Sequence, residues 1–311
     1  MRLLLAVFLA VAVVFPGLLA QQPVQPLASQ ADDDTRISVD VTRVNVLFTV
    51  TDKRGRFITD LTKDDFEIME NKRRQQIMEF TAESDLPLRM AILVDTSNSI
   101  RDRFRFIQEA AIEFLDSVMR PKTDAALVVS FDTSAELVSD LDSDPQVLAS
   151  KIRALRAGGG TSLFDAIYFA CRDKLGKDQP RHKFRRAMVV LSDGDDNQSR
   201  VTRDQALEMA QKADVVIYTI STNISRIETD GDKVLKYLAA ETGGVAFFPF
   251  KVEDLAQSFA NIANELRHQY NLYYRPEPMK TDGSYQEIRI RVKGQKGLVV
   301  RARKGYYAPR M

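Results

Sequence analysis

The sequence predicts an α/β fold: a doubly wound, mostly parallel sheet inserted in a small β-sandwich-like domain built from the N- and C-terminal segments. Three observations predict it. Strand-like and helix-like segments alternate through the middle of the chain, both flanks alternate apolar and polar residues, and neither flank has enough strands to be stable alone. We therefore expect a β segment at 37–84, an α/β domain at 86–268, and a β segment at 270–308 that packs with the first.

In the middle of the chain, short apolar runs alternate with segments of helical spacing. The run Met90–Val94 is continuously apolar, as a strand buried on both faces requires. A helix is predicted next, with Ile107, Ala111 and Phe114 on one face. Further strands are expected at 125–131, 187–191, 215–221 and 245–250, and further helices at 145–155, 162–175, 203–213, 233–242 and 253–268. This order is typical of a Rossmann-like sheet with helices on both faces.

The two flanks have the period of β-strands. In the first flank, residues 37–41 and 44–50 alternate in opposite phase, which indicates a bulge or a break near Thr42. A strand at 66–70, a turn at Asn71-Lys72 and a returning strand at 76–81 follow. In the second flank, residues 287–293 and 300–303 alternate in the same way. An isolated hairpin is marginal, so we expect the flanks to share one domain.

The N-terminus has the features of a secretory signal peptide. Arg2 precedes an uninterrupted apolar run, Leu3 to Phe15, which Pro16 and Gly17 end. We expect residues 1–20 to be removed, 21–36 to be a flexible leader, and the protein to be exported to the periplasm or the exterior. An uncut N-terminal anchor is the alternative. No later stretch is apolar enough to span a membrane, so stable insertion is not expected after cleavage.

Composition narrows the classes of function. The formal net charge is +1, which gives no strong field for nucleic acid. The chain has two histidines, His182 and His268, so zinc sites and histidine-based acid–base chemistry are disfavoured. Its one cysteine, Cys171, lies in a segment of helical apolar spacing and is expected to be a buried structural thiol rather than a nucleophile. We expect a monomer.

A carboxylate and two hydroxyls follow the first buried strand of the α/β segment. They are Asp95, Ser97 and Ser99, at alternate positions of one short loop. The carboxyl ends of parallel strands are where open α/β sheets place their sites, and a hard divalent cation prefers oxygen ligands. The alternative for the motif alone is a loop whose Asp and Ser residues cap the next helix.

Two later segments support the interpretation of this loop as part of a metal site. Three glycines at 158–160 precede Thr161, whose hydroxyl is placed to reach a metal or to cap a helix, and they give its loop freedom to shift. A phosphate-binding loop is disfavoured there because the lysine of that motif is missing. The strand at 187–191 ends at Ser192-Asp193-Gly194, so Asp193 and Asp95 are expected at the same edge of the sheet.

These residues together resemble the metal-ion-dependent adhesion site of von Willebrand factor type A domains. The resemblance covers roughly residues 86–268, and all five metal positions hold the expected residue types: Asp95, Ser97, Ser99, Thr161 and Asp193. It implies that the two serines ligate directly, that the threonine ligates in the ligand-bound state, and that the two aspartates act directly or through water. It also implies that the final helix moves when a ligand binds. The small departure is Asn98, where many members have glycine.

The flanks resemble the bacterial, acidobacterial-type VWFA-related proteins. The stretches that carry this resemblance are Leu61-Thr62-Lys63-Asp64-Asp65-Phe66 and Arg303-Lys304-Gly305-Tyr306-Tyr307.

Two other motifs are expected to have no separate binding function. Asp193-x-Asp195-x-Asn197-x-Ser199 imitates an EF-hand start with Asp204 at its twelfth position, but Gln198 stands where that loop needs glycine. The basic stretch 181–186 is expected to be a solvated connection rather than a site for an anionic partner.

Three functions are compatible with this sequence. The first is a non-enzymatic binding module, used in adhesion or assembly, that holds Mg²⁺, with Mn²⁺ or Ca²⁺ as alternatives. Such a module captures an Asp or Glu side chain of a protein partner, because a cation held mainly by hydroxyls keeps charge and an open coordination position. The second is a metal-assisted hydrolase, which would need a general base of matched pKa. The third is a structural module that does not use its metal.

Overall fold

The computed structural model describes residues 43–82, 86–178, 183–223, 227–249, 252–295 and 297–310. The expected signal peptide, the leader, the first alternating stretch at 37–41 and the start of the basic stretch lie outside these ranges. Among the helices in the described ranges, none combines the length and the apolar character needed to cross a membrane.

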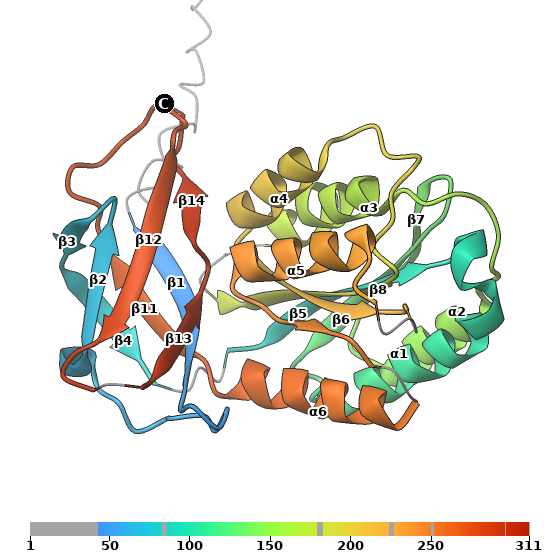
Figure 1. Cartoon of the computed structure of the whole chain (residues 1–311), viewed down its shortest axis with the longest axis horizontal. Coiled ribbons are helices and arrows are strands. Elements are labelled where there is room, and N and C mark those ends of the chain that lie inside the picture. Colours follow the sequence, from blue (N-terminus) through green and yellow to red (C-terminus); the bar gives the residue numbers. More distant parts are fainter. Residues whose placement is uncertain are drawn as a thin grey trace, which may run out of the picture. The chain divides into compact units, whose positions relative to one another are not determined.

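A six-stranded sheet forms the centre of the α/β part (Figure 1), with strand order β10-β9-β8-β5-β6-β7. Neighbouring strands run parallel except the antiparallel pair β6 and β7. The strands are β5 Leu88–Asp95, β6 Ala125–Phe131, β7 Ala135–Asp142, β8 Arg185–Ser192, β9 Val215–Ser221 and β10 Ala246–Phe247. The mostly parallel sheet predicted from the sequence is therefore confirmed.

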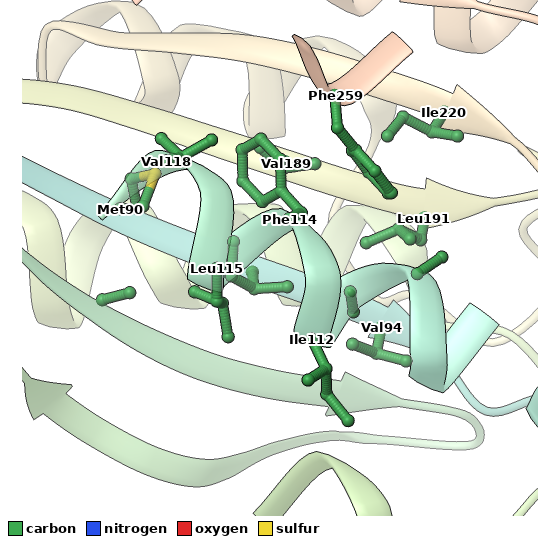
Figure 2. Close-up of a cluster of buried hydrophobic side chains, with 14 of the residues drawn as sticks. Met90, Val94, Ile112, Phe114, Leu115, Val118, Val189, Leu191, Ile220 and Phe259 are labelled. Atoms are coloured by element: carbon green, nitrogen blue, oxygen red, sulfur yellow. The ribbon is translucent and has the colours of Figure 1, made fainter. Parts of the chain in front are cut away.

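Helices cover both faces of this sheet (Figure 1). One face carries α1 Phe104–Val118, α2 Pro145–Ala154 and α6 Val252–Arg267, and the other carries α3 Leu163–Phe169, α4 Arg203–Lys212 and α5 Asp230–Thr242. Alternate residues of β5 supply the two cores: Met90 and Val94 pack toward α1, and Leu93 packs on the opposite side. Figure 2 shows the first core, where Phe114 of α1 contacts Phe259 of α6 with ring centroids 5.1 Å apart.

Several expected elements have different bounds. The predicted helix at 162–175 is α helical only as far as Phe169, and continues as a π turn at Ala170–Lys174 and a 3-10 turn at Leu175–Lys177. The predicted strand at 245–250 pairs with β9 over two residues only, and Pro249, which has no N–H to donate, lies in the rest of that stretch. Strand β7 was not predicted, because its residues are only partly buried at the sheet edge and show no continuous apolar run.

The strands of the two flanks share two four-stranded sheets, ordered β13-β1-β11-β4 and β14-β12-β2-β3. Their bounds are β1 Val44–Thr51, β2 Phe66–Glu70, β3 Arg73–Gln75, β4 Ile77–Thr81, β11 Tyr270–Tyr274, β12 Tyr285–Val292, β13 Val299–Ala302 and β14 Gly305–Tyr307. The strand predicted at 76–81 is β4, which pairs with β11, whereas the strand that returns beside β2 is β3, which was not predicted. Phe48, Phe66 and Tyr270 pack at ring distances of 5.0 to 5.4 Å in the common core.

Two side-chain predictions have clear outcomes. Cys171 is fully buried, as expected, and burial raises the pKa of its thiol. The prediction that the basic stretch 181–186 is solvated is wrong for Arg185 and Arg186, which are 5% and 3% exposed. Both belong to β8, and each donates hydrogen bonds to main-chain carbonyls, so burial of their charge is offset by local partners.

Candidate divalent-metal site

The loop after β5 carries Asp95, Ser97 and Ser99. The backbone N–H of Ser97 donates to Oδ1 of Asp95 at 2.8 Å, which turns the chain sharply after the strand. The N–H of Thr96 donates to the carbonyl of Phe131 at the end of β6, so the loop is tied to the neighbouring strand. The hydroxyl oxygens of Ser97 and Ser99 lie 2.9 Å apart. Three candidate ligands are therefore grouped on one short loop.

Asp95 is a buried carboxylate bound by neutral donors. It is 0% exposed, and its Oδ2 accepts a hydrogen bond of 2.6 Å from the hydroxyl of Ser192. Burial raises the pKa of Asp95 to about 6; the hydrogen bonds from Ser192 and Ser97 lower it, and the charge of Asp193 raises it further. A cation at this point would favour the ionised form that the burial disfavours.

Asp193 follows β8 on a loop that a glycine pair fixes. The N–H of Gly194 donates to the Ser192 hydroxyl at 3.0 Å, and Gly194 has a φ of +85°, a conformation suited to glycine. A Cβ on Gly194 would lie 2.2 Å from the carbonyl oxygen of Gly231, and a Cβ on Gly231 would lie 2.2 Å from that of Asp193. The start of α5 therefore packs directly against the backbone of the Asp193 loop. Asp195 lies beside it, and burial together with the charges of Asp193, Asp230 and Asp232 raises the pKa of Asp195.

Thr161 ends a glycine loop that is held from two sides. The N–H of Gly158 donates to the carbonyl of Thr96 at 2.6 Å, and the N–H of Asn98 donates to the carbonyl of Gly159 at 3.2 Å. Thr161 is 3% exposed, and its N–H donates to Oδ1 of Asn197 at 3.0 Å. The glycines thus permit close contacts as well as conformational freedom.

The five predicted residues lie on three loops that contact one another. Asp95 joins the first loop to the end of β8 through Ser192, and Thr96 joins it to the glycine loop. The glycine loop in turn contacts the Asp193 loop through Thr161 and Asn197. The loops of Asp95 and Asp193 follow β5 and β8, at the same edge of the sheet as expected, and the glycine loop precedes α3.

The chemistry of these residues fits a hard divalent cation. Octahedral coordination at about 2.0–2.1 Å places neighbouring ligand oxygens about 2.9 Å apart, and the Ser97 and Ser99 hydroxyls have this separation. Among the described residues, no three or more His, Cys, Asp or Glu side chains are grouped so that they could hold a metal. The candidate ligand set is of another kind, because three of its five members are hydroxyls.

The EF-hand alternative fits less well. Asn197 contacts Thr161, and the Ser199 hydroxyl contacts both Asp196 and the N–H of Asp165, so these side chains serve the neighbouring helix start. Asp204 lies in α4.

Sequence reasoning missed three residues of this region. The motif that contains Ser192 does not indicate that this residue binds Asp95. The EF-hand-like pattern that contains Asn197 does not indicate its contact with Thr161, and no motif includes Gly231. Only Gly231 carried a local signal, as a glycine in the first turn of a helix with the threonine cap of Thr229 before it.

Comparisons with known proteins agree with this geometry. A family model described as von Willebrand factor type A domain matches residues 90–265, more than half of the 311 residues. Human von Willebrand factor A domain-containing protein 3B is 28% identical over 169 residues, 52% of this chain and 12% of that protein. The chain therefore matches only a small part of that relative's length.

Two solved structures show the same fold. A von Willebrand factor type A protein from Catenulispora acidiphila aligns with a TM-score of 0.51 and 14% identity, covering 79% of this chain and 74% of that one. Proximal thread matrix protein 1 from the mussel byssus, in a form described as having a zinc-occupied MIDAS motif, aligns with a TM-score of 0.50 and 17% identity, over 64% of this chain and 50% of that one.

Proposed function

The chain belongs to the von Willebrand factor type A domain family, and on that premise we propose that it is an exported, metal-dependent protein-binding module. Asp95, Ser97, Ser99, Thr161 and Asp193 hold one divalent cation. The observation that carries the proposal is the pair of hydroxyls 2.9 Å apart beside a fully buried carboxylate whose hydrogen bonds, within the described ranges, come from neutral groups. Mg²⁺ is the proposed ion, with Mn²⁺ or Ca²⁺ as alternatives.

The bound ion would capture an acidic side chain of a partner. A hard divalent cation takes six or more oxygens. The proposed set supplies two carboxylates and three hydroxyls, and some of these five side chains act through water. At least one position is then left for solvent or for a partner. A partner's Asp or Glu carboxylate adds a charged contact there, and its desolvation is offset by direct pairing with the metal.

Binding is preferred over hydrolysis because the carboxylate with the raised pKa, Asp95, is buried and both of its oxygens already accept hydrogen bonds. Asp95 is engaged by Ser97 and Ser192, and the described histidine, His268, lies at the end of α6, where its ring contacts the carbonyl of Asn264. Turnover of model esters or phosphates by the wild type but not by Asp95→Ala would favour the hydrolase instead. Absence of any metal binding would leave a structural module.

The decisive experiment is affinity capture from extracts of the source organism with the purified protein as bait. The arms are wild type with Mg²⁺, wild type with chelator, and Asp95→Ala with Mg²⁺. The proposal expects a specific partner in the first arm alone, and exchange of one partner acid for its amide should release it. Equal capture in all three arms would overturn the metal-dependent mechanism. Calorimetric titrations should include Zn²⁺, because the mussel neighbour is described with that ion.

We also propose that residues 86–268 are the separable domain that carries this function, and that 37–84 and 270–308 fold only together. Strand β1 pairs with β11 and β13, and β2 pairs with β12, so each flank lacks its partners without the other. A fragment of residues 86–268 should unfold cooperatively and bind the metal. A cooperative unfolding transition of 37–84 alone would contradict this division.

A further inference from the structure

Two loops of the proposed site are joined by reciprocal hydrogen bonds. Both main-chain polar groups of Thr161 bind the loop that begins at Asp193. The N–H of Thr161 donates to Oδ1 of Asn197, and its carbonyl accepts from the N–H groups of Asn197 and Gln198, each at 3.0 Å. Further along, the N–H of Phe164 donates to Asp196 at 3.0 Å. The loop that presents Thr161 and the loop that begins at Asp193 are therefore attached at several points.

Asn197 contributes the side-chain hydrogen bond between these two loops. The Asn197 amide oxygen accepts the Thr161 N–H, whereas the bonds to the Thr161 carbonyl come from main-chain groups. An asparagine oxygen has the acceptor capacity and the short reach that this contact needs.

Gly160 gives independent evidence for the same contact. A Cβ at Gly160 would lie 2.9 Å from Oδ1 of Asn197 and 2.6 Å from Cγ of Gln198. Gly160 has no positive φ, so the missing side chain is needed for space rather than for an unusual backbone conformation. The third glycine of the loop is thus explained by the close approach of Asn197 and Gln198.

We propose that Asn197 is a positioning residue that presents the Thr161 hydroxyl to the metal. This inference rests on the proposed function. Fixing the peptide of Thr161 fixes the direction of its side chain, and outer groups that orient a ligand typically change metal affinity by about 10–100-fold. The same bonds join the Thr161 and Asp193 arms, so a displacement of one arm by a partner is transmitted to the other.

The test is a double-mutant cycle on the full chain, with Mn²⁺ affinity measured by calorimetry. Asn197→Ala should weaken binding by about tenfold. In a Thr161→Ala background the same substitution should have little effect, because Asn197 then has no ligand to position. Asn197→Asp keeps the acceptor oxygen and should restore affinity to at least the wild-type value.

Asn71→Ala is the matched control. Oδ1 of Asn71 also accepts a backbone N–H, that of Glu287, at 3.0 Å, but in the β2–β3 turn. This variant should leave Mn²⁺ affinity unchanged. Unaltered affinity in Asn197→Ala, or an equal loss in the Thr161→Ala background, would overturn the positioning role. Unaltered affinity in Asp95→Ala would instead overturn the metal site itself, so the two failures are distinguishable.

Discussion

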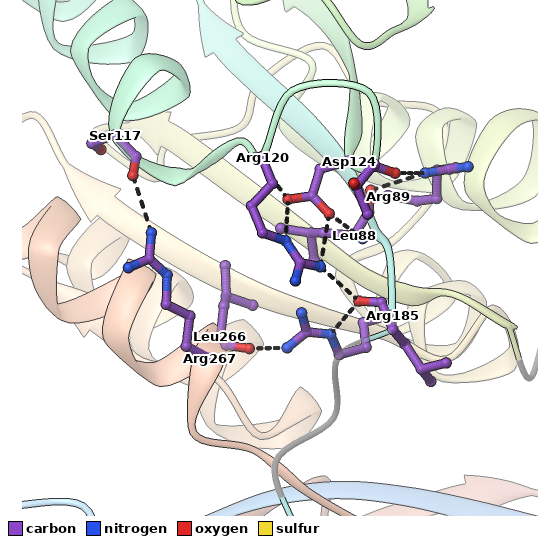
Figure 3. A network of polar contacts seen from close by, with 10 residues as sticks. Leu88, Arg89, Ser117, Arg120, Asp124, Arg185, Leu266 and Arg267 are labelled. Atoms are coloured by element: carbon purple, nitrogen blue, oxygen red, sulfur yellow. Dashed lines mark hydrogen bonds and ion pairs between the residues drawn. The ribbon is translucent and has the colours of Figure 1, made fainter.

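The two edges of the six-stranded sheet each bury an aspartate, and they satisfy it in different ways. At the amino edge, Asp124 is 2% exposed and pairs with the guanidinium of Arg120 at 3.2 Å (Figure 3). It also accepts the N–H of Leu88 at 2.8 Å and that of Arg120 at 2.9 Å. At the carboxyl edge, Asp95 is as deeply buried, and its hydrogen bonds come from the N–H of Ser97 and the hydroxyl of Ser192.

At the amino edge, arginine side chains of the protein itself bind main-chain carbonyl groups. Arg185 donates to the carbonyls of Leu86 and Leu266, and Arg267 donates to the carbonyl of Ser117 (Figure 3). Basic groups thereby cover the carbonyl ends of α1 and α6, where the helix dipole favours positive charge. Asp124 is matched by an arginine, whereas the hydrogen bonds described for Asp95 come from neutral donors, and the proposed metal site depends on this difference.

Asp95→Asn should have the largest effect on the carboxyl edge. The amide keeps the size of the carboxylate but removes the charge that attracts the metal, so Mn²⁺ affinity should fall by at least about 100-fold, or roughly 2.7 kcal/mol. Stability without metal should be unchanged or higher, because a buried charge without a cationic partner is costly. Calorimetry and urea unfolding measure the two quantities. Affinity within threefold of wild type would remove Asp95 from the ligand set.

Metal binding at the carboxyl edge of the sheet should stabilise the folded protein. Binding only to the native state adds about 2.7 kcal/mol at a hundredfold excess over Kd, which corresponds to roughly 5–10 °C in Tm for a domain of this size. Chelator should lower the melting temperature of the wild type and leave that of Asp193→Ala almost unchanged. Equal sensitivity of both proteins would place the metal elsewhere.

Asp124→Asn should show the opposite pattern. It removes the negative charge that pairs with Arg120, which destabilises the fold by about 1–3 kcal/mol; the loss is less than for a fully buried pair because the Arg120 side chain is 40% exposed. Metal affinity should not change, since the substitution is at the other edge of the sheet. Urea unfolding with and without Mn²⁺ measures both effects. Loss of metal binding in this variant would break the contrast between the edges.

The fold could be predicted where burial is uniform along an element. Strands β6 and β9 have the predicted bounds, Ala125–Phe131 and Val215–Ser221, because nearly every residue in them is buried and apolar runs mark them. Strand β7 lies at the edge of the sheet and each of its residues is partly or largely exposed, so no continuous apolar run marks it. The short β10 depended on how far pairing with β9 extends, which is a property of the assembled sheet.

The candidate site could be predicted only as far as its motifs are local. Asp95, Ser97 and Ser99 are close in sequence, and the strand that ends at Asp193 indicates the same edge. The bond from Ser192 to Asp95 spans 97 positions, and that from Thr161 to Asn197 spans 36. Such contacts follow from the packing of loops after the sheet forms, and neither residue type nor spacing indicates them.

The smallest effect is expected from Ser192→Ala, which removes one neutral donor from Asp95. The Ser192 hydroxyl donates to Oδ2 of Asp95 at 2.6 Å and accepts the N–H of Gly194 at 3.0 Å, so it connects the two aspartate loops. Its loss should cost about 1 kcal/mol of stability and reduce Mn²⁺ affinity by up to about tenfold, because the carboxylate is less well oriented.

Ser221→Ala is the control for this last prediction, because Ser221 makes the same pair of bonds at the end of β9. Its hydroxyl donates to Asp232 at 2.7 Å and accepts the N–H of Asn223 at 3.1 Å, but Asp232 is not a proposed ligand. Both variants should lose similar stability in urea, since each removes one buried hydroxyl from a carboxylate. Only Ser192→Ala should lose metal affinity. Equal affinity in the two variants would show that Ser192 supports the fold of the carboxyl edge without orienting Asp95 for the cation.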